Sequence, residues 1–259
     1  MVLGEEGYQT GEGRSRTNLL LPGLQQELLE EIYKVNKNIV LVLVNGRPLN
    51  ISWADENIPA IVEAWHLGSQ AGNAIAQVLY GDYNPSGKLT MTFPRNVGQV
   101  PIYYNYKNTG RPSKSQKAVT TSAYSDVENS PIYPFGYGLS YTSFVYSDLT
   151  ISSEIINSKE SIIASITLTN SGEYKGKEVV QLYIRDLFGS LSRPLKELKG
   201  FEMVELEPGE YKKFSFTIDN SLLKYYTVNK RWESEPGDFY VYIGGDSDVE
   251  MFKKFELID

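Results

Sequence analysis

Apolar side chains recur along the first 95 residues in two alternating patterns, one of helical period and one typical of strands. Residues 21–37 place leucine, isoleucine and valine on one side at helical spacing, which predicts an amphipathic helix. The positions that form this stripe are Leu24, Leu28, Ile32 and Val35. The run IVLVLV at residues 39–44 is continuous and rich in β-branched side chains, which is typical of a strand buried on both faces of a parallel sheet.

Two more helices are predicted before residue 95. Residues 56–65 read as a short helix with Pro59 in its first turn, where the absent proline N–H has no partner to lose. Residues 69–81 read as a longer helix that Gly81 ends. Its predicted inward-facing positions are Ala71, Ala74, Ile75 and Val78. Strands and helices alternating at this spacing predict an α/β arrangement.

The periodic pattern stops between residues 96 and 143, where glycine, proline, asparagine, serine and lysine dominate. So long a stretch without regular structure is uncommon inside a compact domain, and we interpret it as a long inter-domain connection. From residue 144 to residue 259 the composition becomes that of short strands separated by turns. The clearest strands are 161–170, 177–186, 196–206, 212–219 and 238–245. They predict an all-β, immunoglobulin-like sandwich.

The chain therefore divides into residues 1–95, an α/β domain with a mostly parallel sheet, the connection 96–143, and the β-sandwich 144–259. An α/β domain with two or three strands cannot close a sheet between two helix layers. Met1, Val2 and Leu3 read as the end of a buried strand whose beginning is missing. We therefore expect the chain to be the C-terminal part of a larger protein.

Composition excludes several classes of function. The net charge is −7 and no basic block occurs, which argues against a nucleic-acid partner. Cysteine is absent, so the chain has no disulfide, no thiol nucleophile and no thiolate metal site. The apolar run at residues 39–44 is far shorter than the roughly 20 residues of a membrane span, and we predict no membrane partner. No export signal is visible at the N-terminus, and the compartment is unknown from these data.

No cofactor and no metal are predicted. A single histidine leaves carboxylates as the remaining metal ligands, and no calcium-loop spacing occurs. The glycine-rich run at residues 4–13 lacks the lysine of a phosphate-binding loop and the dinucleotide fingerprint. We interpret the histidine, His66, as a structural residue after a predicted helix end. Asn45–Pro48 read as a turn that packs at a strand end, with a place in a cleft as the alternative.

Several stretches together resemble glycoside hydrolase family 3, the β-glucosidase and β-xylosidase type. The stretches that carry the resemblance are TGEGRSR (10–16), LPGLQQELL (21–29), VLVLVNGRPL (40–49), AIVEAW (60–65), GNAIAQVLYGDYNPSGKLTMTFPR (72–95), VPIYYNYKNTGRP (100–112), YPFGYGLSYTSF (133–144), TNSGEYKGKEVVQLYIRD (169–186) and RPLKELKGFEMVELEPGE (193–210). The resemblance implies a partial α/β sandwich followed by a fibronectin III-like domain. In a complete family member a TIM-like barrel comes first, and that barrel is absent from this sequence.

The resemblance also implies a chemistry. The family cleaves terminal, non-reducing β-D-glucosyl residues with retention of configuration, using an Asp nucleophile on the barrel and a Glu acid/base on the α/β domain. Glu12 in TGEGRSR matches that acid/base glutamate. The implied partners are a β-linked oligosaccharide or glycoside and the barrel. With one carboxyl group and no nucleophile, we expect the isolated chain to be inactive, and a periplasmic or extracellular location for the parent.

The residues around Glu12 suit an acid/base loop, but they do not identify one. Gly11 and Gly13 permit an exposed loop with unusual backbone angles and close approach to a substrate. A cationic neighbour lowers a carboxyl pKa, so we assign the arginines Arg14 and Arg16 to anchoring the loop. From the residues alone, a solvated polar loop remains the alternative, and Glu5 and Glu6 are rival candidates.

Other interpretations stay open at this stage. Arg111 in NTGRP is a candidate substrate-binding residue, with a solvated loop as the alternative. The chain can instead be a non-catalytic carbohydrate-binding or structural module, for which we expect an exposed aromatic platform. It can also be a subunit that complements a separate barrel chain. A homodimer is a further partner hypothesis.

Overall fold

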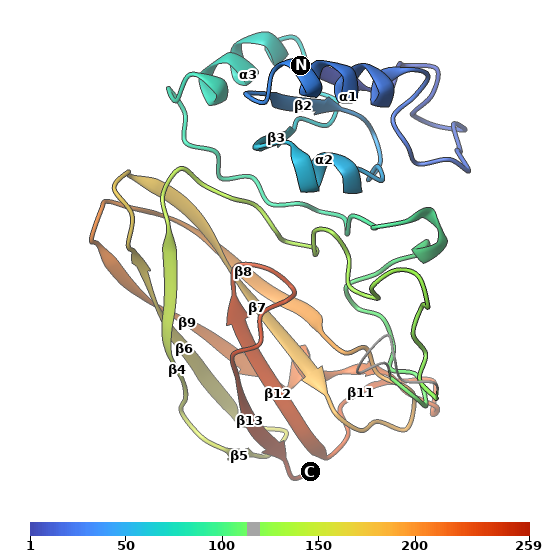
Figure 1. The fold of residues 1–259 in the computed structure, drawn as a ribbon. Helices are drawn as coiled ribbons and strands as arrows, with labels where there is room; N and C mark the ends of the chain where they lie inside the picture. The colour runs from blue at the N-terminus through green and yellow to red at the C-terminus, as the bar shows by residue number, and fades with distance from the viewer. Residues whose placement is uncertain (113–119) are drawn as a thin grey trace. The chain divides into compact units, whose positions relative to one another are not determined.

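The computed structural model describes residues 1–112 and 120–259, which form two compact units (Figure 1). The first unit comprises Met1–Tyr83, Met91–Ile102 and the described part of Ser113–Tyr133. The second unit comprises Asn84–Thr90, Tyr103–Pro112 and Pro134–Asp259. The predicted fold class, α/β followed by an all-β sandwich, is confirmed. The domain boundaries given above stay a prediction, and residues 113–119 of the predicted connection lie outside the described residues.

The first unit is built on a parallel sheet of three strands in the order β1-β2-β3. The strands are β1 (Val2–Gly4), β2 (Val40–Val44) and β3 (Ala60–Glu63). In the central strand β2, Leu41, Val42 and Leu43 are at most 1% exposed, so successive residues are buried on opposite faces. The prediction of a strand buried on both faces is therefore confirmed.

Three helices and one short 3₁₀ turn accompany these strands (Figure 1). They are α1 (Gln25–Val35), α2 (Ser52–Asn57), α3 (Ala71–Leu79) and η1 (Val97–Gln99). The helices predicted over 21–37 and 69–81 are confirmed as α1 and α3. Gly81, at φ +81°, has the left-handed backbone that commonly follows a helix end, as predicted.

The apolar sides of these two helices are not both buried. On α1 the only buried residue is Leu29, whereas Leu24 is 75% and Val35 is 86% exposed. Helix α3 has no fully buried residue, but Ala71, Ile75 and Val78 are partly buried, so they form its less exposed side as predicted, whereas Ala74 is exposed. The helical period of the sequence predicts both helices correctly. Full burial of an apolar helix side also requires neighbouring elements that cover it, and in the described residues most of these side chains stay at least partly exposed.

The helix predicted over 56–65 is wrong. The helix α2 ends at Asn57, and residues Ala60–Glu63 form the strand β3. Ile58, directly before Pro59, is extended at φ −93° and ψ 125°, as the proline ring disfavours helical angles in the preceding residue. Ile61 and Val62 then pair in parallel with the central strand. Pro59 therefore separates a helix from a strand instead of beginning a helix.

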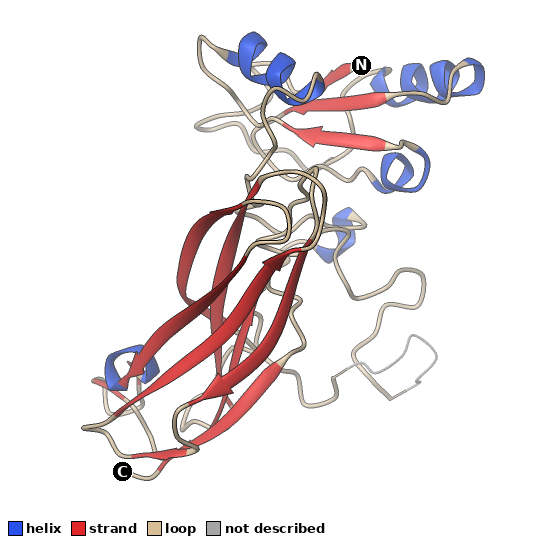
Figure 2. Ribbon diagram, turned by 90° about the vertical axis from the view of Figure 1, so that its left-hand side faces the viewer, coloured by secondary structure: helices blue, strands red, loops and turns tan. Residues whose placement is uncertain are grey.

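The second unit is a β-sandwich with long strands (Figure 2). Its elements are β4 (Phe144–Ile151), β5 (Ile155–Ile156), β6 (Ser161–Asn170), β7 (Gly176–Asp186), β8 (Glu197–Leu206), β9 (Tyr211–Asp219), α4 (Asn220–Leu223), β10 (Tyr225–Tyr226), β11 (Trp232–Glu233), β12 (Gly237–Gly244) and β13 (Phe252–Leu257). One sheet has the order β5-β13-β12-β7-β8, a second has the order β4-β6-β9, and β10 pairs separately with β11. All five strands named from the sequence are present.

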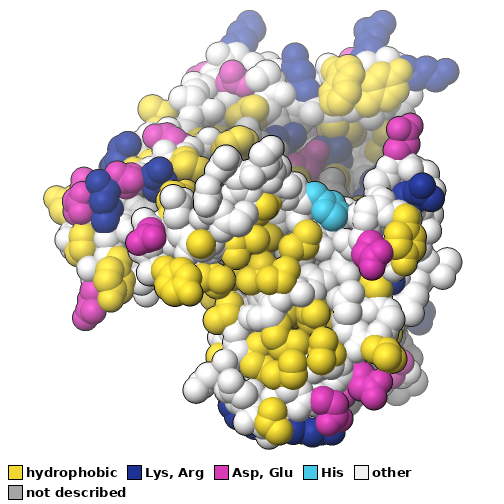
Figure 3. Space-filling view, turned by 90° about the horizontal axis from the view of Figure 1, so that it is seen from above, with side chains coloured by type: hydrophobic (Ala, Val, Ile, Leu, Met, Phe, Trp, Pro, Cys, Tyr) yellow, Lys and Arg dark blue, Asp and Glu magenta, His cyan; other side chains and the backbone are white. Residues whose placement is uncertain are grey.

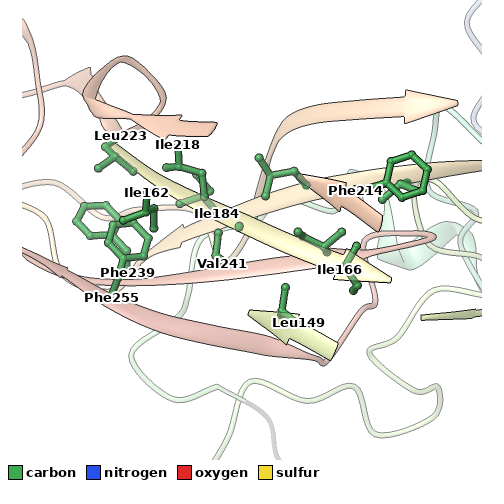
Figure 4. Close-up of a cluster of buried hydrophobic side chains, with 14 of the residues drawn as sticks. Leu149, Ile162, Ile166, Ile184, Phe214, Ile218, Leu223, Phe239, Val241 and Phe255 are labelled. Atoms are coloured by element: carbon green, nitrogen blue, oxygen red, sulfur yellow. The ribbon is translucent and has the colours of Figure 1, made fainter. Parts of the chain in front are cut away.

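The core of the sandwich lies between its two sheets (Figure 4). Strand β6 contributes Ile162, Ile166 and Leu168, each with no exposed surface, and strand β12 contributes Val241 and Ile243 from the other sheet. Phe239 on β12 stacks on Phe255 of β13 with ring centroids 5.3 Å apart. Alternation of apolar and polar side chains along these strands therefore produces a two-sided core, as the sequence pattern predicts.

Two of the long motifs that carry the family resemblance stabilise this second unit. Lys88 of GDYNPSGKL lies 3.0 Å from Glu178 on β7 and donates a 2.9 Å hydrogen bond to the carbonyl oxygen of Gly138. Asn84 of the same motif donates to the carbonyl oxygen of Lys175 and accepts from the Ser140 hydroxyl, both at 2.9 Å. These contacts give Lys88, Asn84 and Ser140 a role in anchoring the motifs to the second unit.

Candidate active site

Glu12 lies on an exposed loop that follows the carboxyl end of strand β1. Gly11 and Gly13 on either side have φ values of +118° and +70°, which favour glycine over other residues. The space around both glycines is open, so the backbone conformation, and not crowding, explains why glycine stands there. The loop therefore presents the Glu12 carboxyl group to solvent, where a ligand can reach it.

The start of this loop is held by Glu5, which is only 6% exposed. Its carboxylate accepts from Arg16 at 2.6 Å, lies 3.0 Å from the Arg47 guanidinium, and accepts from the Gly46 N–H at 3.2 Å. Burial raises the pKa of Glu5, but the Arg16 hydrogen bond, the Gly46 N–H and the Arg47 charge outweigh it and lower that pKa. Glu5 is therefore an ionised anchor, and this geometry does not suit a proton donor.

Arg47, in the turn after β2, ties the rest of the loop to the sheet. Its Nη2 atom donates to the backbone oxygens of Gln9 and Arg14, both at 2.7 Å. These two residues lie on either side of Glu12 in the chain, so one guanidinium fixes both arms of the loop. Arg16 anchors the loop with its side chain, as its assignment requires, whereas Arg14 takes part through its carbonyl oxygen.

A hollow of about 720 Å³ opens beside the Glu12 loop. Its lining includes Gly11, Gly13 and Arg14 from the loop, Gly46 from the turn after β2, and His66 from the turn after β3. The His66 side chain is exposed and visible at the surface as the cyan group in Figure 3. The hollow thus gathers the carboxyl ends of three parallel strands, the place where α/β folds bind ligands.

Behind the hollow, a polar pair joins strands β2 and β3. The side-chain amide of the fully buried Asn45 donates to Glu63 at 3.3 Å, and the Trp65 N–H donates to the same carboxyl group at 2.9 Å. Burial raises the pKa of Glu63 to about 7, although these two hydrogen bonds oppose that shift. Trp65 has a left-handed φ of 50°, which is strained for a residue with a side chain.

The structure places the remaining sequence candidates as follows. Glu6 is exposed on the same loop as Glu12, whereas Glu5 is buried beneath it. Arg111 is exposed and belongs to the second unit. Among residues 1–112 and 120–259, no cluster of three His, Cys, Asp or Glu side chains could hold a metal ion. Within the same residues, no helix is long and apolar enough to cross a membrane.

Three features of this site are not predicted from the sequence. They are Arg47 as the loop anchor, the Asn45–Glu63 pair, and the place of His66 in the lining of the hollow. A usable signal was present, because all of them stand at or just after the carboxyl ends of apolar strands. The sequence favours packing for the turn Asn45–Pro48, with a place in a cleft as the alternative, and Gly46 and Arg47 of this turn line the hollow. The sequence also predicts a helix where β3 lies, so it does not show the second strand end. With β3 recognised, His66 falls at the same sheet edge as the Glu12 loop.

The chain matches two known domain types. Residues 1–141 match the glycosyl hydrolase family 3 C-terminal domain, and residues 178–247 match the fibronectin type III-like domain. The chain is 48% identical over 258 residues to a periplasmic beta-glucosidase of Salmonella typhimurium, covering 99% of this chain and 34% of that protein. It is 42% identical to a beta-xylosidase of Formosa agariphila, covering 99% of this chain and 35% of that protein.

A solved structure has the same fold throughout. The beta-glucosidase from Listeria innocua, crystallised in complex with glucose, superposes with a TM-score of 0.94 at 38% identity. The match covers 100% of this chain and 36% of that one. The chain therefore spans about a third of the length of the relatives that it matches.

Proposed function

Because the chain belongs to glycoside hydrolase family 3, we propose that it supplies the acid/base carboxyl group, Glu12, of a retaining β-glucosidase. The observation that carries the proposal is the Glu12 loop itself. The carboxyl group is exposed between two glycines of positive φ, on a loop that Glu5, Arg16 and Arg47 fix to the carboxyl end of a parallel sheet. A fixed backbone with a free carboxyl tip is what a proton donor to an incoming substrate requires.

In this proposal Glu12 acts twice. A carboxylate from the barrel, about 5–5.5 Å away, attacks the anomeric carbon while Glu12 gives its proton to the glycosidic oxygen, so the leaving alcohol departs neutral. Glu12 then takes a proton from water as that water attacks the anomeric carbon. The bond to the nucleophile breaks, and the sugar leaves with its original configuration.

The proposal includes the expected inactivity of the 259-residue chain alone. The covalent intermediate needs the second carboxylate, which family 3 carries on a barrel outside this sequence. The substrate we propose is a terminal β-D-glucosyl residue, supported by relatives named as beta-glucosidases from two organisms. The name of the Salmonella relative supports a periplasmic or extracellular location for the parent enzyme.

A hybrid enzyme tests the role of Glu12. This chain replaces the matching 258-residue region of the Salmonella relative, and release of nitrophenol from an aryl β-glucoside is measured. For methyl β-D-glucoside, assayed in parallel because its leaving group is poor, we expect Glu12→Ala to lower kcat about 10²–10⁴-fold. Azide should restore turnover of an activated aryl glucoside and give the β-glucosyl azide.

Glu6→Ala is the matched control, because Glu6 is exposed on the same loop and its side chain makes no hydrogen bond in the described part of the chain. We expect the control to keep its rate within about twofold, as surface substitutions usually do. Unchanged activity in Glu12→Ala, or no azide product, refutes the assignment. Rate recovery on mixing the free chain with a separate barrel would favour the complementing-subunit alternative.

A second candidate function rests on a separate observation in the second unit. Tyr226 and Trp232 face each other across the small β10-β11 pair, with ring centroids 6.0 Å apart, and are 51% and 68% exposed. The two rings meet edge to face, and their exposed surfaces suit stacking on sugar rings, which supports the alternative of a carbohydrate-binding module. Retention of the chain on insoluble β-glucan, lost in Trp232→Ala, would support that function. Equal retention of both proteins excludes it.

Arg111 stays a proposed substrate-binding residue, supported by its exposure and by its place in the NTGRP motif. In the hybrid enzyme we expect Arg111→Ala to raise KM for the aryl glucoside with little change in kcat. A homodimer likewise stays a proposal, and sedimentation of the purified chain tests it.

A further inference from the structure

His66 occupies a position that a purely structural histidine does not need. The residue is exposed, yet its ring lies at the wall of the hollow beside the Glu12 loop. A Cβ atom added at Gly46 would lie 3.3 Å from the His66 Cδ2 and Nε2 atoms, and 2.0 Å from the Thr10 Oγ1 atom. The ring therefore packs closely against the turn after β2, where the glycine at position 46 leaves room chiefly for the Thr10 hydroxyl group and also for the His66 ring.

The backbone that carries His66 is held in an unusual conformation. Trp65, the preceding residue, has φ 50°, and its N–H is fixed by the Glu63 carboxyl group at 2.9 Å. The Trp65 ring packs on Phe93 with centroids 5.9 Å apart. Strained residues persist only where surrounding contacts over-determine them, and they cluster at functional sites. These contacts direct the next residue, His66, into the hollow.

The imidazole makes no hydrogen bond to any residue in the described ranges 1–112 and 120–259. A histidine ring offers one donor and one acceptor when neutral. Near the Glu12 loop, both groups are thus available to a ligand. We propose that His66 is a substrate-binding residue that hydrogen-bonds a hydroxyl group of the leaving sugar in a β-linked disaccharide.

The leaving-group side follows from the proposed role of Glu12, on which this inference rests. The acid/base carboxyl group must lie against the glycosidic oxygen, since it protonates that atom. Gly11 and Gly13, which flank Glu12, line the hollow together with His66, whereas the Glu12 side chain itself is not part of that lining. A sugar that leaves from the Glu12 loop therefore has the hollow, with His66 on its wall, as its neighbour. A contact with that sugar's hydroxyl groups selects among leaving groups without taking part in proton transfer.

The chain's single histidine allows a direct test on the unmodified chain. One ¹³C–¹H signal from the imidazole Cε1 atom is expected in an NMR spectrum, because no other histidine contributes. We expect this signal to move on addition of cellobiose up to several hundred millimolar, and to stay in place with the same concentration of myo-inositol. An unmoved signal, or an equal shift with inositol, overturns the proposal.

Kinetics of the hybrid enzyme give a second test. Cellobiose and methyl β-D-glucoside both have poor leaving groups that need Glu12, but only cellobiose has leaving-sugar hydroxyl groups. We expect His66→Ala to lower kcat/KM for cellobiose about fivefold to tenfold, the effect of one lost hydrogen bond, and to leave methyl glucoside unchanged. His66→Gln, which keeps a donor and an acceptor, should recover part of the loss.

The outcomes separate this inference from the proposed function. Equal losses on both substrates would mean that the loop is disturbed, and they overturn the role of His66. A loss of about 10²–10⁴-fold in Glu12→Ala, together with an imidazole signal that still moves with cellobiose as in the parent chain, supports both assignments. If Glu12→Ala stays active, the acid/base assignment fails while the imidazole shift still decides the sugar contact. Glu56→Ala, exposed on α2 and outside the hollow, is the control variant.

Discussion

The two units turn similar apolar patterns into opposite outcomes. In the second unit, strands such as β6 and β7 bury most of their residues in a core supplied by two facing sheets. In the first unit, α1 has a regular apolar stripe, yet Leu24, Leu28 and Val35 are exposed and a single leucine is buried. Periodicity therefore predicts which face of a helix or strand is apolar. Whether that face is buried depends on the neighbouring elements that pack against it.

This comparison predicts that the free energy of unfolding is distributed unequally between the units. Replacing the tryptophans by 5-fluorotryptophan gives a separate ¹⁹F signal for each unit, since Trp53 and Trp65 lie in the first unit and Trp232 lies in the second. Their ¹⁹F signals can be followed separately during urea unfolding. We expect the signals of the first unit to change at lower urea, because fewer apolar side chains are buried there. Coincident transitions would contradict that expectation.

The largest effect is expected in the core of the sandwich. Phe239 is 1% exposed and stacks on Phe255, so Phe239→Ala removes a buried ring and leaves a cavity. Such changes cost about 3–5 kcal/mol. We expect the free energy of unfolding reported by Trp232 to fall by this amount, with a lower urea midpoint, while Trp53 and Trp65 keep their midpoints. Phe201→Ala, with a ring that is 70% exposed, should lower the free energy of unfolding reported by Trp232 by less than about 1 kcal/mol.

The sandwich is also the region that the sequence predicts best. Strands with period-2 alternation and Pro-Gly turns carry local signals, and Ser161–Asn170 is found at the predicted residues. Strand β3 cannot be predicted in this way, because Ala60–Glu63 is too short to show a period. Pro59, which separates α2 from β3, also suits the first turn of a helix and so favours the wrong element. Short elements are defined by their pairing with β2, and that pairing is long-range information.

The candidate site divides in the same way. The exposed Glu12 loop could be predicted, since glycine, glutamate and arginine in one run are incompatible with a buried element. Arg16 as an anchor could be predicted as well, but Arg47 could not, because Glu5 and Arg47 are 42 residues apart and meet only when β1 and β2 pair. The place of His66 in the hollow depends on the fold in the same way. Residues from separate strand ends meet only in the folded chain, so no local sequence pattern predicts that they lie close together.

A matched pair of leucines tests the uneven cover of α1. Leu29 has no exposed surface, whereas its neighbour Leu28 is 49% exposed. We expect Leu29→Ala to lower the free energy of unfolding of the first unit by about 2–5 kcal/mol, and Leu28→Ala by less than about 1 kcal/mol. Both substitutions leave helix propensity nearly equal, so their difference isolates burial. Similar losses in the two variants would mean that the exposed face of α1 is covered in solution.

The smallest expected effect separates the units by pH. Burial raises the pKa of Glu63 to about 7 from its ordinary value of 4.5, so between these pH values the folded first unit binds a proton that the unfolded chain releases. The resulting stability is fully present below pH 4.5 and is lost as pH rises toward 7. The shift corresponds to at most about 3 kcal/mol. The second unit does not contain this carboxyl group.

We therefore expect the unfolding transition reported by Trp65 to have a lower urea midpoint at pH 8 than at pH 5. Glu63→Gln should remove most of that difference. The amide cannot ionise but keeps an oxygen that can accept from the Trp65 N–H, so the left-handed turn before His66 should persist. Because parent and variant are compared at each pH, other titrating groups cancel. If the pH dependence is unchanged in Glu63→Gln, another group causes it, and Glu63 does not stabilise the first unit through its raised pKa.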